Sequence, residues 1–272
     1  MNESTQDILV HTEGGVRTIT FNRVDKKNSI TEAMYTTMAD ALAQSEQDNA
    51  VRCVVFQGDP TIFSAGNDIA DFLQQVSQIS QAPQQEAEST AIVAQRPVWR
   101  FLHNLATFSK PVVAAVCGPA VGIGTTLLLH CDLVYAGDNA AFSLPFVNLG
   151  LCPEAASSLL LPQMLGYHRA AEALLLGEPF MAEAALEVGL INRIVAPSEC
   201  NAIAQGQAQK LAAKPLSALI ETKRLLKTAQ LSAVRARMDE EGRSFTDLMS
   251  GPAAKEALTA FMEKRRPDFR HC

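Results

Sequence analysis

The sequence predicts an α/β fold that is followed by an all-helical C-terminal region. Up to about residue 198, short β-prone runs alternate with helical patterns, the order typical of an α/β layer arrangement. After Val195 every pattern is helical. The chain has 272 residues, of which 47% are hydrophobic and 19% charged, so it can bury a large core. We therefore expect a core over residues 1–198 and a helical region over residues 199–272, which would pack on that core or on a neighbouring subunit.

The first expected elements are two paired strands, a helix and a third strand. Residues 7–12 and 16–22 are β-prone and flank Glu13-Gly14-Gly15, so they predict a hairpin. Ser29-Ile30-Thr31-Glu32 matches a capping box and precedes periodic apolar residues, which predicts a helix of about 18 residues. Residues 52–58 form an apolar run that is typical of a buried strand.

The remaining elements follow from helical periodicity and from the residues that interrupt it. The stretch 74–95 is rich in Gln and Ser and predicts a mobile loop or an exposed helix start. A helix is expected at 97–109 and is stopped by Lys110-Pro111. Further expected elements are strands at 112–116, 132–136 and 141–144, a helix at 122–130, and C-terminal helices at 199–213, 216–226, 231–249 and 253–264.

Charge and cysteine usage exclude several classes of function. A formal net charge of −6 and a pI near 5.4 give no basic excess for nucleic acid or for an anionic membrane. The six cysteines lie mostly in apolar strings without CxxC spacing, which favours a reducing compartment and predicts no metal site. Because neither end carries a targeting signal, we expect a cytoplasmic protein. No GxSxG elbow accompanies the five histidines, so a hydrolytic triad is not expected.

Three segments could carry chemistry, and each also has a plain structural explanation. Phe63–Ile69 follows a strand and could offer free backbone N–H groups to a negative charge, or it could be an ordinary turn. Gly118–Gly124 lets the backbone approach closely either a ligand or a neighbouring helix, and it matches neither GxGxxG nor a P-loop. In Leu149–Ala156, Pro153-Glu154 could simply start a helix, or Glu154 could act as an acid or base.

Taken together, in this order and at these distances, the three segments resemble the crotonase, or enoyl-CoA hydratase/isomerase, superfamily. The resemblance spans nearly the whole chain. It implies a spiral of stacked ββα units with an acyl-CoA site in residues 1–198. The helical region 199–272 would assist assembly into a homotrimer or a dimer of trimers. It also implies that FSAGNDI and GPAVGIG each supply one backbone N–H, from Asn67 and Gly122, to an oxyanion hole for the thioester oxygen.

The resemblance further implies which residues bind the substrate. The CoA nucleotide would rest near Lys26–Ser29 and near Ala65–Ile69, with either Lys26 or Lys27 facing a phosphate. No separate cofactor is expected, because CoA is part of the substrate. The expected substrate-binding residues are Lys26, Ser29, Ala65, Gly66, Asn67, Asp68, Ile69, Phe146 and Leu149.

The resemblance also bears on the reaction. Hydratases of this superfamily carry two glutamates at positions that match Thr125 and Phe146, and neither of these can act as an acid or base. The stretch PFVNLGLCPEAASS is instead similar to the peroxisomal-type Δ3,Δ2-enoyl-CoA isomerases, in which the matching Glu154 is the catalytic base. Walled by Phe146 and Leu149, a lone carboxylate would have a raised pKa. The expected reaction converts 3-enoyl-CoA to 2-trans-enoyl-CoA in fatty acid β-oxidation. The alternatives are another crotonase reaction, such as hydration or dienoyl-CoA isomerisation, or a non-catalytic acyl-CoA-binding module.

Overall fold

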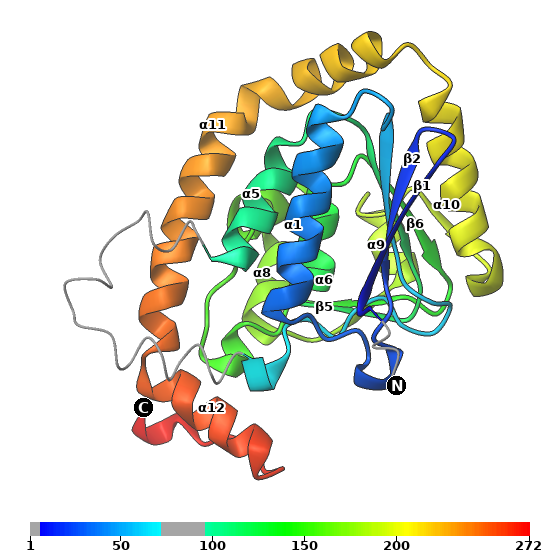
Figure 1. Cartoon of the computed structure of the whole chain (residues 1–272). Coiled ribbons are helices and arrows are strands. Elements are labelled where there is room, and N and C mark those ends of the chain that lie inside the picture. The colour runs from blue at the N-terminus through cyan, green and yellow to red at the C-terminus, as the bar shows by residue number, and fades with distance from the viewer. Residues whose placement is uncertain (1–5, 72–95) are drawn as a thin grey trace.

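A six-stranded sheet forms the centre of the protein (Figure 1), a computed structural model that describes residues 6–71 and 96–272. Only the first pair, β1 with β2, is antiparallel, and the other strands of this sheet run parallel. In sheet order the strands are β1 (Ile8–Glu13), β2 (Val16–Phe21), β3 (Cys53–Gln57), β4 (Val112–Val116), β6 (Leu133–Gly137) and β9 (Arg193–Val195).

A second, three-stranded sheet follows the same order along the chain as the last three strands of the first sheet. It contains β5 (Pro119–Val121), β7 (Ala141–Ser143) and β8 (Phe180–Met181). Each of β4 and β6 is followed within a few residues by a strand of the small sheet, and β4 pairs parallel with β6 just as β5 pairs parallel with β7. Successive ββα units therefore stack on one another, which confirms the expected α/β spiral.

Helices cover both faces of the large sheet because alternate side chains of each strand point to opposite faces. Val54 and Phe56 of β3 join the main core, against which α1 and α5 pack, whereas Cys53 and Val55 join a second core with α10. In Figure 1, α1 and α5 lie side by side and α10 lies on the other side of the strands. The helices are α1 (Glu32–Gln47), α5 (Pro97–Thr107), α6 (Ile123–Thr126), α7 (Ser157–Leu165), α8 (Tyr167–Leu176), α9 (Ala182–Glu187), α10 (Pro197–Ala212), α11 (Leu216–Met249) and α12 (Pro252–Met262), with 3-10 turns η1 (Val24–Lys26), η2 (Leu127–His130), η3 (Val147–Leu149) and η4 (Phe269–His271).

The C-terminal region contains one long helix where two were expected. Residues 216–226 and 231–249 belong to α11, a single helix of 34 residues that extends over roughly 50 Å. The intervening residues 227–230, Lys-Thr-Ala-Gln, contain no Gly or Pro, so nothing ends the helix there. Figure 1 shows α11 passing α5 along one side of the molecule.

Three other expectations differ from the structure or fall outside it. The N-cap of α1 is Thr31, whose hydroxyl accepts from Met34 N, because the hydroxyl of Ser29 is engaged with Arg23 and Asp68 instead. The expected helix at 122–130 is a four-residue α-helix followed by a 3-10 turn. The segment expected to be a loop or helix start at 74–95 lies outside the described residues.

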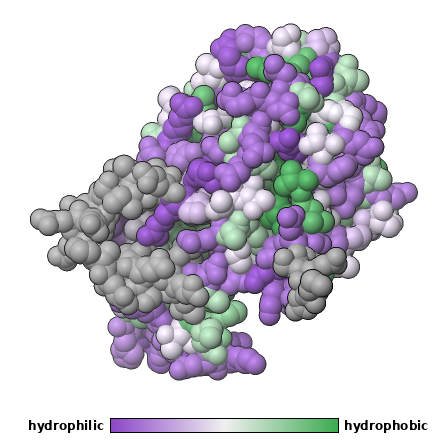
Figure 2. Space-filling view, viewed as in Figure 1, coloured by the Kyte–Doolittle hydropathy of each residue, from purple (hydrophilic) through white to green (hydrophobic). Residues whose placement is uncertain are grey.

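Most of the face in Figure 2 is hydrophilic, with a hydrophobic patch over the N-terminal hairpin, where Leu9 and Val10 are exposed. Within residues 6–71 and 96–272, no helix has the length and apolar character needed to span a bilayer.

Candidate active site

Glu154 is a buried carboxyl group on the loop between η3 and α7. Only 3% of the residue is exposed, and its Oε1 accepts a hydrogen bond from the Thr126 hydroxyl at 2.6 Å. Burial raises the pKa of Glu154 to about 8; the Thr126 hydrogen bond lowers it and the nearby Glu241 raises it further. The first position of the helix is Ser157, so Pro153-Glu154 is not a helix start. The helix-capping explanation for Glu154 is therefore wrong.

The carboxyl group faces a cavity with mixed walls. Tyr35 donates a hydrogen bond to the side-chain oxygen of Asn67, and burial followed by the proximity of Glu154 raises the pKa of Tyr35. Trp99 and Phe245 meet edge to face, with ring centroids 6.0 Å apart. The cavity is lined by Ile30, Tyr35, Asn67, Asp68, Asp71, Arg96, Val98, Trp99, Glu154, Phe245, Thr246 and Met249. It therefore takes residues from both sides of the expected boundary at 198–199.

A second cavity adjoins the first, since Asn67 and Phe245 line both. Its walls bring together the two glycine-containing loops that the sequence singled out. They comprise Ala65, Gly66, Asn67, Ile69, Val121, Gly122, Ile123, Pro145, Phe146, Leu149, Leu151 and Phe245. Five other expected substrate-binding residues line this cavity together with Asn67 and Gly122. They are Ala65, Gly66, Ile69, Phe146 and Leu149.

Two backbone amides at this second cavity are free to donate. On either side of Asn67, Ile30 N donates to Gly66 O at 2.8 Å and Asp68 N donates to Ile30 O at 2.9 Å. This alternation leaves the Asn67 N–H without a partner among the described residues. Ile123 is the first residue of α6, so its N–H has no carbonyl within the helix, and it meets none elsewhere in the described chain.

The Gly122 amide is already used. Its N–H donates to Ser143 O at 2.9 Å and thereby extends the pairing of β5 with β7. The expectation that Gly122 supplies the second donor therefore disagrees with the structure, and the free amide is that of the next residue, Ile123. Gly122 has φ +55° and ψ −116°, a conformation that favours glycine and turns the chain into α6.

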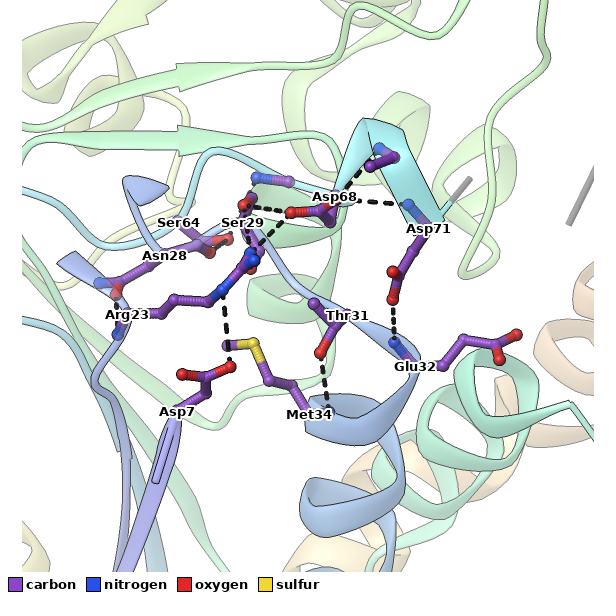
Figure 3. Close-up of polar contacts among 12 residues, drawn as sticks. Asp7, Arg23, Asn28, Ser29, Thr31, Glu32, Met34, Ser64, Asp68 and Asp71 are labelled. Atoms are coloured by element: carbon purple, nitrogen blue, oxygen red, sulfur yellow. Dashed lines mark hydrogen bonds and ion pairs between the residues drawn. The ribbon is translucent and has the colours of Figure 1, made fainter. Parts of the chain in front are cut away.

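The Asp68 carboxylate fastens the loop that carries Asn67 (Figure 3). Its Oδ2 accepts from Arg23 Nη1 at 2.6 Å and from the Ser29 hydroxyl at 3.0 Å. Its Oδ1 accepts from the backbone N–H groups of Ala70 and Asp71. Asp68 and Ser29 therefore stabilise the conformation of the loop, and Arg23 donates hydrogen bonds to both of them.

Lys26 stands apart from this arrangement. It ends the η1 turn and is exposed, and it lines neither of the two cavities. Its contact with a CoA phosphate stays a prediction.

Sequence reasoning missed several residues of the first cavity. Tyr35 and Phe245 occupy apolar positions of amphipathic helices, where an aromatic residue predicts core packing and nothing more. Thr126, which does not line the cavity but donates to Glu154, lies in the stretch expected to be a helix at 122–130, where nothing marks it as a partner of a buried carboxyl group. In residues 6–71 and 96–272, no three His, Cys, Asp or Glu side chains are grouped so as to hold a metal ion.

The fold and the site together define a class of protein. Stacked ββα units place two free amides on separate loops beside a buried carboxyl group, an arrangement suited to proton transfer next to a carbonyl group. The family profile described as enoyl-CoA hydratase/isomerase matches residues 11–271. The chain belongs to this family, the crotonase superfamily of acyl-CoA enzymes.

Individual relatives differ in the reactions that their names describe. The chain is 36% identical over 260 residues to enoyl-CoA delta isomerase 2 of Rattus norvegicus, covering 96% of this chain but 63% of the rat protein. It is 35% identical over 263 residues to 1,2-epoxyphenylacetyl-CoA isomerase of Escherichia coli, covering 96% of this chain and 97% of that protein. The solved structure of OdaA from Pseudomonas aeruginosa is similar with a TM-score of 0.87 and 45% identity, over 95% of this chain and 99% of that one.

Proposed function

We propose that the protein is an enoyl-CoA isomerase that converts 3-enoyl-CoA to 2-trans-enoyl-CoA, with Glu154 as the acid and base. The supporting observation is the state of the carboxyl groups that line the first cavity. Asp68 is neutralised by Arg23, and Asp71 accepts the backbone N–H of Glu32 at 3.0 Å. The Glu154 carboxyl group has only the Thr126 hydroxyl as a hydrogen-bond partner within the described residues. It is thus the carboxylate that can both take up and release a proton.

The chemistry needs one mobile proton and no water. The Glu154 carboxylate removes a proton from C2, and the electron pair of that C–H bond moves into a dienolate whose charge lies largely on the thioester oxygen. Glu154 then returns the proton to C4, the C3–C4 double bond becomes a C2–C3 double bond, and the thioester carbonyl is restored. A carboxyl group with a raised pKa serves both steps, because it is a stronger base than an exposed glutamate.

Backbone amides would stabilise the dienolate. In this proposal the Asn67 and Ile123 N–H groups donate to the thioester oxygen as its charge develops. Loss of one such donor typically costs about 3 kcal/mol of transition-state stabilisation. Ala65, Gly66, Phe146 and Leu149 would enclose that oxygen and exclude water.

Hydration is disfavoured because a second acid or base is absent from the matching positions. Thr125 donates its hydroxyl to Ala120 O at 2.6 Å, and Phe146 is an apolar wall of the second cavity. If Ile123 is the donor in place of Gly122, the position three residues further on is Thr126, which also has no carboxylate. One glutamate can move a proton between two carbons, whereas activating water and protonating the product would need both roles at once.

We also propose that the CoA nucleotide lies near Lys26 and that the chain assembles as a homotrimer or a dimer of trimers. Both rest on the family resemblance. Lys26 lies five residues after Phe21, the end of β2, on the same stretch that fastens Asp68, so a phosphate near Lys26 is compatible with an acyl group at Asn67.

The test is a product assay with the purified protein. 3-Enoyl-CoA, 2-trans-enoyl-CoA and a 3,5-dienoyl-CoA are each incubated in water enriched in ¹⁸O, and the products are identified by mass and by chromatography. We expect 3-enoyl-CoA to give 2-trans-enoyl-CoA without ¹⁸O, and Glu154→Gln to abolish this while acyl-CoA binding persists. The matched control is Glu172→Gln, at an exposed glutamate of α8. Unchanged turnover by Glu154→Gln, ¹⁸O in the product, or binding without turnover would each overturn the proposal.

A further inference from the structure

The turn that follows Glu154 has a costly backbone conformation. Ala155 has φ +62° and Ala156 has φ +55°, so two consecutive non-glycine residues adopt the left-handed conformation. Each of these costs roughly 1–2 kcal/mol relative to ordinary backbone. The conformation reverses the chain between the buried Glu154 and the first residue of α7. It persists only if neighbouring groups stabilise it.

A buried carboxylate from the C-terminal helix binds one side of this turn. Glu241 of α11 is 5% exposed, and its oxygens accept from Ala156 N at 2.6 Å, Ser158 N at 2.9 Å and the Ser158 hydroxyl at 2.5 Å. Three donors directed at one carboxylate stabilise its ionised form. Glu241 therefore satisfies the amides that the left-handed turn and the start of α7 leave free.

A histidine binds the other side. His130 Nε2 lies 2.8 Å from Ala155 O, and because a carbonyl oxygen only accepts, Nε2 carries the proton. Burial, and then the nearby Lys227 charge, lower the pKa of His130 to about 4, so the ring is neutral near neutral pH. The turn is thus held from two sides. Glu241 accepts from the Ala156 N–H, and His130 donates to the Ala155 carbonyl oxygen.

We propose that Glu241, together with His130, is a positioning residue that fixes the turn after Glu154, so that α11 sets the direction of the catalytic carboxyl group. The proposal rests on the proposed role of Glu154. The same stripe of α11 carries Glu241, Phe245 and Met249, one and two helical turns apart, and the last two line the cavity that Glu154 faces. A shift of α11 would therefore move the turn and the cavity wall together.

Glu241 also acts on Glu154 through its charge. A like charge nearby disfavours ionisation, and Glu241 accordingly raises the pKa of Glu154. The other titratable groups around this pair are Tyr35 from α1, His130 from η2, Cys152 from the loop before α7, and Arg237 one turn earlier on α11. Burial raises the pKa of Glu241 above its ordinary value, and the hydrogen bonds from Ser158 and Ala156, and then the Arg237 charge, oppose that rise.

The decisive variant is Glu241→Gln, compared with Glu240→Gln at the exposed neighbour on the same helix. A glutamine has one acceptor oxygen and an amide nitrogen that cannot accept, so it loses the charge and at least one backbone hydrogen bond. We expect kcat at its pH plateau to fall tenfold or more, with KM changed less than twofold. We also expect the alkaline rise of activity to move to lower pH, because the like charge is gone. A purely structural role would lower stability but leave the position of this rise unchanged.

A second measurement separates this proposal from the proposed reaction. In protein labelled with ¹³C at the glutamate carboxyl carbon, the signal absent from Glu154→Gln identifies Glu154, and its titration is followed by NMR without substrate. A titration that moves to lower pH in Glu241→Gln supports the coupling even if no 3-enoyl-CoA is converted. An unmoved titration and an unmoved activity profile overturn it. If Glu241→Gln does not fold, Glu241→Asp, which keeps the charge but shortens the side chain, and His130→Gln are assayed instead, and a wild-type kcat in both overturns the positioning role.

Discussion

Replacing Thr126 by valine should shift the pH dependence of the reaction to higher pH. Valine has nearly the same shape as threonine but cannot donate to Glu154 Oε1, a hydrogen bond of 2.6 Å in the native protein. A hydrogen bond to a charged group contributes about 1.5–3 kcal/mol, and one pKa unit corresponds to about 1.4 kcal/mol. The pKa of Glu154, about 8 in the native protein, should therefore rise by about one to two units in Thr126→Val.

The consequence at neutral pH is large. With a pKa of about 8, roughly a tenth of Glu154 is ionised at pH 7, and the variant would leave about a hundredth to a thousandth ionised. Isomerase activity at pH 7 should fall about 10- to 100-fold, and the two proteins should approach each other as the pH rises.

The assay is kcat/KM for 3-enoyl-CoA from pH 6 to pH 9.5, with thioester stability checked at each pH. The matched control is Thr126→Ser, which keeps the hydroxyl and should keep the native profile. A Thr126→Val profile that rises at the same pH as the native one, or at a lower pH, would refute the claim that this hydroxyl sets the pKa of the catalytic group.

Two further predictions concern stability and the second amide. Because the folded-state pKa of Glu154, about 8, exceeds its ordinary value of 4.5, its retained proton favours the folded state fully below pH 4.5, and this contribution is lost as the pH rises towards 8. Glu154→Gln has no such proton to lose. Its free energy of unfolding in urea, relative to that of the native protein, should therefore rise between pH 5 and pH 9, by at most about 5 kcal/mol. A difference that does not change with pH contradicts this prediction. Ile123→Pro removes the free N–H at a first helical position and should reduce kcat/KM about 100-fold, whereas Ile123→Ala keeps that N–H; equal losses in both variants would mean that the amide is not a donor.

The sheet was predictable because its strands are short and almost wholly apolar. The runs VVF and VVAAV are buried on both faces, as parallel strands are, and no helix pattern competes with them. Helix boundaries were less predictable because they depend on partners from elsewhere in the chain. Ser29 fits a capping box, yet its hydroxyl is bound by Arg23 and Asp68, and the cap moves to Thr31.

The site was predictable as three segments but not as a set of atoms. Glu154 could be singled out because its segment resembles the isomerase motif, and the structure shows that this residue is buried. The second amide was misplaced by one residue, because the pairing of β5 with β7 uses the Gly122 N–H and a sequence does not reveal this register. Tyr35, Phe245 and Glu241 come from α1 and α11, far from Glu154 in the chain, and nothing local identifies them.

The opposing contacts of Glu154 make sense if it works as a base near neutral pH. Each unit by which its pKa exceeds the pH lowers the ionised fraction tenfold, while the rate of proton removal by the ionised form rises by less than tenfold. Burial and the Glu241 charge raise the pKa, and the Thr126 hydroxyl opposes them. Without Thr126 the carboxyl group would be too seldom ionised, and without burial it would be a weak base for a carbon acid. A pKa of about 8, raised by burial, lowered by the Thr126 hydroxyl and raised further by the Glu241 charge, lies near the balance between these two losses.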